Sequence, residues 1–365
     1  MFTAYTNGKI FTGDKIENGK AVLTDNEVVV GLVNADSIPS QYRIEDLNGF
    51  TLAPAFVDLQ IYGGNGKLFS QELSVESLKA TYEYCLHGGC THFMITMATN
   101  TIEKFLQGFE VVSEYWQQGG KGLLGLHLEG PYINVIKRGA HLQNCVKTPT
   151  LAEVEMLLKK GNGIFKMMTL APEQCDDAVI KLLQQHNIII SAGHTNATYQ
   201  QAMDAFNNGI SAATHLFNAM SPLQHREPGM VGAIMNHPFV MSSIVCDGVH
   251  VDYAAVHIAK KILQQRLFFI TDAVTETTSG EYQHLYRGDR YALPDGTLSG
   301  SALTMLQCVK NAVAHAGISL EEALRMAAAY PAQLITDKKL GKIEEGYQAD
   351  FVVFDSLLKL QRVYC

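Results

Sequence analysis

The sequence lacks the features that mark several large classes of protein. It has no apolar run approaching the roughly 18 residues that span a bilayer, and no basic, apolar leader at its start. It also has no cluster of Lys and Arg of the kind that holds a phosphate backbone, and its formal net charge is −8. We therefore expect a cytoplasmic protein that binds neither a membrane nor a nucleic acid.

Cysteine motifs and phosphate-binding loops are missing as well. The seven cysteines are odd in number and show no Cys-x-x-Cys spacing, which argues against a disulfide framework and a zinc ribbon. No expected strand is followed by Gly-x-Gly-x-x-Gly, and residues 63–67 lack the spacing and the Ser or Thr of a phosphate loop. These absences disfavour a doubly wound nucleotide-binding sheet.

The chain does contain enough apolar residues for a large core, because 47% of its 365 residues are hydrophobic. Its central part alternates between the patterns of strands and helices. The eight expected strands lie at residues 54–61, 91–97, 122–128, 164–170, 187–193, 210–216, 240–246 and 266–271. The expected helices lie at 75–86, 102–116, 151–160, 177–185, 199–207, 254–265, 302–316 and 320–329.

Eight nearly continuous apolar strands that alternate with helices favour a closed (β/α)8 barrel of the TIM type over an open sheet. Short apolar pieces separated by Gly, Asn and Asp turns fill residues 1–52, and a similar pattern returns from residue 340 onward. We therefore predict an α/β protein with the barrel at 53–335. Residues 1–52 and 336–365 should together form a small β-sandwich domain.

Ionisable residues stand where four of the expected strands end. Glu129 directly follows the third strand, His194 follows the fifth, His215 lies at the end of the sixth, and Asp272 follows the eighth. Taken singly, each has a plainer explanation, such as a loop carboxylate, a core histidine or a helix cap. Together they would meet at one rim of the barrel, where a carboxylate and two imidazoles suit a divalent metal ion and Asp272 suits a proton-accepting base.

Three more polar residues fall in loops on the same side of the expected barrel. His141 follows the third strand, Arg226 the sixth and His250 the seventh. On one rim, such residues suit a polar, anionic substrate, and Arg is the better choice for forked contacts to a phosphate.

The sequence motifs that contain these residues resemble those of the N-acetylglucosamine-6-phosphate deacetylase family of the amidohydrolase superfamily. The resemblance runs along nearly the whole chain, and several of its motifs are more specific than the general pattern of the superfamily. It rests on Ala53-Pro54-Ala55-Phe56-Val57-Asp58, His127-Leu128-Glu129-Gly130-Pro131, Ala192-Gly193-His194-Thr195, His215-Leu216-Phe217-Asn218-Ala219-Met220, Arg226-Glu227-Pro228-Gly229, Asp247-Gly248-Val249-His250, Thr271-Asp272-Ala273, Leu298-Ser299-Gly300-Ser301 and Gly341 through Gly346 to Ala349-Asp350.

The resemblance implies a homodimer in which each chain holds one divalent ion through Glu129, His194 and His215. Zinc is the first expectation, with iron, manganese or cobalt as alternatives. The implied reaction is hydrolysis of an acetamide on a phosphosugar to glucosamine 6-phosphate and acetate, with Asp272 as general base and then acid, and with His141 at the oxyanion. The implied substrate contacts are Ala140, His141, Asn218, Ala219, Arg226, Asp247, Gly248, Val249, His250, Leu298, Ser299 and Gly300.

Three other functions stay open at this point. The first is deacetylation of another N-acetylated amino-sugar phosphate or of an N-acyl amino acid. The second is a non-haem iron oxygenase, which also uses two histidines and a carboxylate, although Asp272 at a strand end counts against it. The third is a sugar-phosphate-binding regulator without activity, which the intact set of four ionisable residues disfavours. Release of acetate without oxygen would exclude the second and third of these functions.

One departure from the wider superfamily generates a prediction about metal content. Gln60 and Tyr62 stand where many amidohydrolases carry His-x-His for a second ion, and a neutral amide or phenol binds zinc-like ions poorly. Activity should therefore saturate near one metal per chain and disappear on chelation. Metal analysis of purified variants should show the site lost in Glu129→Gln and only modestly weakened in Gln60→Ala. Two tightly held ions in the active protein would contradict this prediction.

Overall fold

The computed structural model describes residues 1–335 and 339–365, which divide into two compact units. One unit consists of Met1–Asp58, Cys85–His92 and the described part of Thr304–Cys365, and the other of Leu59–Tyr84 and Phe93–Leu303. The expected boundary between residues 335 and 336 falls at the edge of 336–338, which lie outside the described residues.

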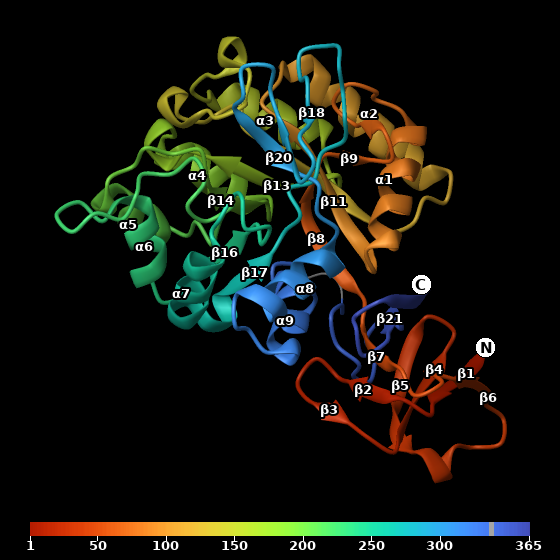
Figure 1. Cartoon of the computed structure of the whole chain (residues 1–365). Coiled ribbons are helices and arrows are strands. Elements are labelled where there is room, and N and C mark those ends of the chain that lie inside the picture. Colours follow the sequence, from red (N-terminus) through yellow and green to blue (C-terminus); the bar gives the residue numbers. More distant parts are fainter. Residues whose placement is uncertain (336–338) are drawn as a thin grey trace. The chain divides into compact units, whose positions relative to one another are not determined.

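Eight parallel strands form the central sheet in the order β17-β16-β15-β14-β13-β12-β11-β8, which is the chain order of a barrel. These strands are β8 (Phe56–Ile61), β11 (Cys90–Ala98), β12 (Leu123–Glu129), β13 (Phe165–Leu170), β14 (Ile189–Ala192), β15 (Ala212–Ala213), β16 (Met241–Ile244) and β17 (Leu267–Phe269). The helices between them are α1 (Val75–His87), α2 (Ile102–Gln117), α3 (Leu151–Lys160), α4 (Asp177–Gln185), α5 (Tyr199–Asn207), α6 (Gly229–Asn236) and α7 (Tyr253–Leu263). Figure 1 shows α2 to α7 arranged around the outside of the sheet.

Backbone hydrogen bonds link the first strand to the segment that follows the last one. The Asp272 N–H donates to the carbonyl of Gln60 at 3.0 Å, and the Tyr62 N–H donates to the carbonyl of Ala273 at 2.9 Å. The same segment bonds on its other side to a short strand, because the Ser301 N–H donates to the carbonyl of Asp272 at 2.9 Å. The prediction of a (β/α)8 barrel is confirmed, and Asp272 is held from both sides at its seam.

The two ends of the chain build the small β structure together. Its four-stranded sheet has the order β5-β4-β1-β6 and its five-stranded sheet the order β22-β21-β7-β2-β3. Residues of both sheets, among them Val22 and Phe351, share one buried cluster, so the predicted β-sandwich is confirmed. The strands are β1 (Phe2–Thr6), β2 (Lys9–Phe11), β3 (Ile16–Glu17), β4 (Lys20–Asp25), β5 (Val28–Asn34), β6 (Arg43–Asp46), β7 (Thr51–Pro54), β21 (Phe351–Phe354) and β22 (Leu360–Tyr364), and the helices of this unit are α8 (Met305–His315), α9 (Leu320–Ala327) and α10 (Ala329–Ala332).

Several barrel strands are shorter than the sequence predicts, and for three of them the residues that follow the strand give a reason. After β14, β15 and β17 the chain reaches His194, His215 and Asp272, whose φ angles are 49°, 38° and 54°. These values lie in the left-handed region, which is incompatible with extended pairing. The backbone therefore leaves the sheet at the residues expected to carry the chemistry.

Two segments differ from the sequence prediction. Helix α6 (Gly229–Asn236) was not expected, because it contains two glycines and is buried around most of its circumference, so it has no amphipathic period. The strands β18 (Leu285–Tyr286), β19 (Arg290–Ala292) and β20 (Leu298–Ser301) form a small antiparallel sheet that the sequence analysis did not separate from a loop. Among the described residues, no helix combines the length and the apolar composition needed to cross a bilayer.

Candidate functional site

A cavity of about 240 Å³ is lined by residues that follow the barrel strands. Twelve residues named by the sequence analysis line it: Glu129, Ala140, His141, His194, His215, Asn218, Ala219, His250, Asp272, Leu298, Ser299 and Gly300. The other four, Arg226, Asp247, Gly248 and Val249, are not part of its lining. Arg226 lies in the exposed part of the loop before α6.

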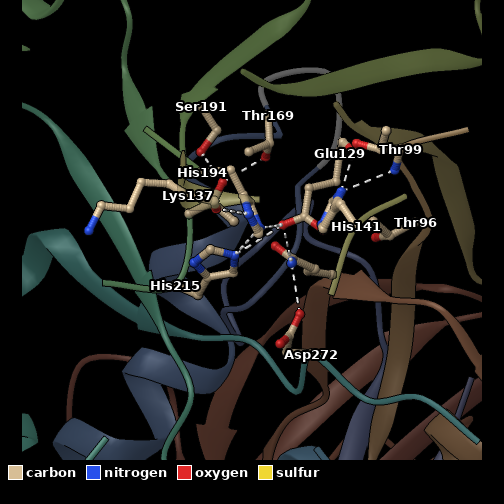
Figure 2. A network of polar contacts seen from close by, with 12 residues as sticks. Thr96, Thr99, Glu129, Lys137, His141, Thr169, Ser191, His194, His215 and Asp272 are labelled. Carbon is tan, nitrogen blue, oxygen red and sulfur yellow. Dashed lines mark hydrogen bonds and ion pairs between the residues drawn. The ribbon is translucent and has the colours of Figure 1, made fainter. Parts of the chain in front are cut away.

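The carboxylate of Glu129 lies at the centre of the polar contacts, and only 1% of this residue is exposed. Its Oε1 atom is 3.3 Å from Nε2 of His194 and 3.1 Å from Nε2 of His215. Its Oε2 atom is 3.2 Å from Nε2 of His141 and accepts a hydrogen bond from the Tyr62 hydroxyl. The three histidines therefore converge on one carboxylate, with two on one oxygen and one on the other (Figure 2).

Backbone groups fix different tautomers in His194 and His141. Nδ1 of His194 lies 2.9 Å from the carbonyl of Lys137, which only accepts, so Nδ1 donates and Nε2 of the neutral ring keeps a lone pair. Nδ1 of His141 instead accepts from the Thr99 N–H at 3.2 Å, so its Nε2 carries the proton and donates toward Glu129. His194 is thus prepared to bind a cation, and His141 is prepared to donate a hydrogen bond.

Two sets of three residues come close enough to share an ion. The ligand atoms of Glu129, His141 and His194 lie within 4.8 Å of one another. The predicted set exchanges His141 for His215, whose Nε2 is 3.0 Å from Nε2 of His194. Ligand atoms about 2.0–2.1 Å from a tetrahedral ion lie roughly 3.3 Å apart, which is close to the separations in this second set. These separations do not distinguish the two sets, because His141 also lies 3.2 Å from Glu129. The tautomers differ, since Nε2 of His141 carries a proton whereas Nε2 of His194 keeps a lone pair.

The surroundings of His215 also fit a cation at its Nε2 atom, which faces Glu129 and His194. Its Nδ1 atom is buried and has no hydrogen-bond partner among the residues that the structure describes. Burial opposes protonation of the ring, but the hydrogen bond and charge of Glu129 outweigh it and raise the pKa of His215. A divalent ion would take over the role of that proton beside the Glu129 charge.

The pKa values of Glu129 and His194 are set by burial and by the charged groups around them. Burial raises the pKa of Glu129, but the charges of His194 and His141 and their hydrogen bonds outweigh it and hold this pKa well below its ordinary value. Burial, together with the charge of His141, lowers the pKa of His194 to about 4. A neutral imidazole beside an ionised carboxylate is the state in which both groups can ligate a metal.

Gln60 connects the carboxylate at the centre of the site to the proposed base. Its Nε2 atom donates to Oδ1 of Asp272 at 2.8 Å and lies 3.1 Å from Oε1 of Glu129. The same atom is 2.9 Å from the Tyr62 hydroxyl. Gln60 and Tyr62, which stand where many amidohydrolases carry His-x-His, therefore take part in the site. They hold the carboxylates of Glu129 and Asp272 in place by hydrogen bonds.

A layer of buried hydroxyl groups lies below these residues inside the barrel. His127 donates through Nδ1 to the carbonyl of Leu59 at 3.1 Å, so its Nε2 accepts from the Thr169 hydroxyl at 2.8 Å. The hydroxyls of Thr169 and Thr214 are 2.7 Å apart, and the hydroxyl of Ser191 continues the chain at 2.6 Å from Thr214. Burial lowers the pKa of His127 to about 4, which keeps this ring neutral below the site.

Asp247 orients His250 without reaching the cavity itself. Its Oδ2 is 2.5 Å from Nδ1 of His250, and its Oδ1 accepts from the backbone N–H groups of Val249 and His250, both at 2.8 Å. Burial works against the charge of Asp247, but these hydrogen bonds and the charge of His250 outweigh it and lower the pKa of the carboxyl. The sequence analysis placed Asp247 among the substrate contacts, whereas its contacts in the structure are those of a support for His250.

Several residues that line the cavity were not named as site residues by the sequence analysis. They are Tyr62, Leu68, Ser70, Ala98, Gly139, Val274, Tyr282, His284 and Thr297. The sequence analysis named Tyr62 only because many amidohydrolases carry a histidine at this position. Leu68 lies in β10 (Lys67–Leu68), which pairs with β9 (Gly63–Gly64), and Tyr282 and His284 precede β18. Nothing in the local sequence distinguishes Leu68, Val274 and Tyr282 from ordinary core residues.

Comparison with known proteins agrees with this geometry. The model of the amidohydrolase family matches residues 51–364, and that of the NagA composite domain matches residues 1–52. The chain is 35% identical to an N-acetylglucosamine-6-phosphate deacetylase from Haemophilus influenzae over 97% of this chain and 95% of that protein. It is 31% identical to an N-acetylgalactosamine-6-phosphate deacetylase from Shewanella over 95% of this chain and 90% of the relative. The crystal structure of N-acetylglucosamine-6-phosphate deacetylase from Pasteurella multocida superimposes with a TM-score of 0.95 at 34% identity, covering 100% of this chain and 98% of the other.

The hydrogen bond from Tyr62 to Glu129 generates a prediction about metal affinity. Removing the hydroxyl in Tyr62→Phe should weaken divalent-ion binding, because groups that orient a ligand typically contribute about 10–100-fold to affinity or activity. Titration against a competing chelator measures this change directly, without an activity assay.

Tyr132→Phe is the matched control for this experiment. Tyr132 is also buried and its hydroxyl also donates to a carboxylate, that of Glu153 at 2.6 Å, but it does not line the cavity. This variant should bind the ion as tightly as the unmodified protein. Equal affinity in both variants would show that the Tyr62 hydroxyl does not orient Glu129.

Proposed function

The chain belongs to the amidohydrolase family, and on this premise we propose that it hydrolyses the acetamide of N-acetylglucosamine 6-phosphate to glucosamine 6-phosphate and acetate. The observation that carries the proposal is the convergence of Glu129, His194, His215 and Asp272 at one end of the barrel, with His194 in the tautomer that binds a cation. The extent of the similarity to deacetylases of this kind supports the choice of substrate.

The ligand set proposed for the ion is Glu129, His194 and His215. Two imidazoles and one carboxylate suit zinc, and three protein ligands leave a position open for water or substrate. When bound, such an ion polarises a carbonyl and lowers the pKa of a bound water toward neutrality. Zinc is our proposal for its identity, and metal analysis of the purified protein tests it against iron, manganese and cobalt.

Asp272 is the proposed base and then the acid. Its Oδ1 is held by Gln60 at 2.8 Å, its backbone is bonded on both sides, and it lines the cavity. In this role it takes a proton from the attacking water and later gives it to the nitrogen of the departing amine. Burial raises the pKa of Asp272, which makes the carboxylate a stronger proton acceptor.

His141 is the proposed donor to the acetamide oxygen. Its Nε2 carries the proton because Nδ1 accepts from the Thr99 N–H, and its hydrogen bond to Glu129 shows that this proton points into the site. A donor whose tautomer is fixed before the reaction can stabilise the charge that develops on the carbonyl oxygen, once its proton turns from Glu129 to that oxygen.

His250 and Arg226 are the proposed contacts of the 6-phosphate. His250 lines the cavity with its ring fixed by Asp247, and Arg226 lies on the exposed loop before α6, which follows the cavity residues Asn218 and Ala219. We further propose a homodimer in the cytoplasm. Light scattering on the purified protein tests the oligomeric state.

A second candidate substrate is N-acetylgalactosamine 6-phosphate, which differs in configuration at one carbon. The similarity to the Shewanella protein of that name favours including it. The ratio of kcat/KM for the two epimers decides between them, and a ratio in favour of the galactosamine compound would replace the first proposal.

We predict that Asp272→Asn retains the metal and loses most turnover. The amide can still accept the Gln60 hydrogen bond, but it does not take up a proton at neutral pH, and loss of a general base typically costs about 10²–10⁴-fold in rate. Acetate release and metal content should be measured on the same preparation. Retention of more than about a tenth of the activity would show that Asp272 has only a structural role.

We predict that Arg226→Ala raises KM for the phosphorylated sugar by about tenfold or more, because a hydrogen bond to a charged group contributes about 1.5–3 kcal/mol. The unphosphorylated sugar serves as the control substrate, since it presents no dianion to the guanidinium group. An equal effect on both substrates would show that Arg226 only supports its own loop.

A further inference from the structure

One wall of the cavity is more apolar than hydrolysis of an acetamide requires. Tyr62, Leu68, Val274 and Tyr282 line this wall and form one buried hydrophobic cluster. Ala98 lines the cavity beside them and packs against the same cluster. We call these five residues the apolar wall. A single methyl group would touch only a part of such a surface.

The hydroxyls of both tyrosines of the apolar wall are hydrogen-bonded to other groups of the protein. The Tyr62 hydroxyl donates to Glu129, and the Tyr282 hydroxyl donates to the carbonyl of Thr99 at 2.6 Å. With both hydroxyls satisfied by the protein, the rings offer mainly carbon atoms to the cavity. The apolar wall therefore suits an aliphatic group and has no free donor for a polar one.

The site also indicates which part of the substrate faces this wall. Tyr62 and His141 share Oε2 of Glu129, while His194 and His215 share Oε1, so the apolar wall adjoins the side of the carboxylate that carries His141. Asn218 and His250 also line the cavity, and we have proposed His250 as a contact of the phosphate. In an amide, the acyl chain and the nitrogen lie on opposite sides of the carbonyl carbon. A sugar at Asn218 and His250 thus places its acyl chain against the apolar wall.

We propose that this protein also hydrolyses N-acyl glucosamine 6-phosphates whose acyl chain is longer than acetyl, namely the propionyl and butyryl compounds. The inference rests on the proposed function, because it uses the same ligands, base and oxyanion donor. The amide C–N bond breaks, a C–O bond to the water oxygen forms, and Asp272 carries one water proton to the leaving amine. The products are the fatty carboxylate and glucosamine 6-phosphate.

The experiment compares N-acetyl, N-propionyl and N-butyryl glucosamine 6-phosphate by amine release. Burial of each added methylene against the apolar wall favours binding by about fourfold, which offsets the restriction of a longer chain. We expect kcat/KM for the propionyl compound within tenfold of that for the acetyl compound. A decrease of more than tenfold would overturn the inference. If the acetyl compound itself is not hydrolysed, the proposed function fails instead.

Variants of Leu68 test whether the apolar wall is responsible. Leu68→Phe should narrow the cavity and lower the ratio of propionyl to acetyl turnover at least fivefold, and Leu68→Ala should raise this ratio. Leu142→Phe is the matched control, because Leu142 packs against the same cluster but does not line the cavity, so the ratio should stay within twofold of the unmodified value. If Leu68→Phe does not fold, Leu68→Ala still decides. An unchanged ratio in the Leu68 variants would assign the acyl chain to another part of the cavity.

Discussion

The buried charge of Glu129 is the constraint to which the rest of the site responds. An ionised carboxylate withdrawn from water is unstable unless hydrogen bonds and opposite charge replace its hydration. Here Tyr62 and His141 donate hydrogen bonds to Oε2. Gln60, His194 and His215 surround Oε1. A divalent ion held by Glu129, His194 and His215, as proposed, would add to this compensation and would couple metal binding to the stability of this end of the barrel.

The same constraint extends outward from the carboxylate. His141 donates to Glu129 because the Thr99 N–H occupies its other nitrogen, and His194 keeps a lone pair because the Lys137 carbonyl occupies its own. Main-chain groups thus decide which ring keeps a lone pair at Nε2 and which carries a proton there. This selection is rigid, since neither backbone group can change from donor to acceptor.

The sequence carries part of this information. Glu129 was identifiable because a charge directly follows an apolar strand, and the same logic applied to His194, His215 and Asp272. The pairing of the terminal segments was also predictable from their similar turn patterns, as β21 and β7 confirm. Tautomers were not predictable, because the carbonyl and the N–H that impose them arrive from other loops. The apolar wall was missed because Leu68 and Tyr282 have the composition of ordinary core, and only the fold brings them beside the carboxylate.

The left-handed backbone at His194, His215 and Asp272 has an evolutionary consequence. Side chains with a Cβ atom are strained at such φ angles, and glycine or asparagine adopts them at lower cost. Selection for catalysis and selection for a durable fold therefore act in opposite directions at these three positions. In a homologue that no longer needs the activity, these three positions would be substituted first. Glycine at them would mark a protein that retains the barrel fold but has lost the reaction.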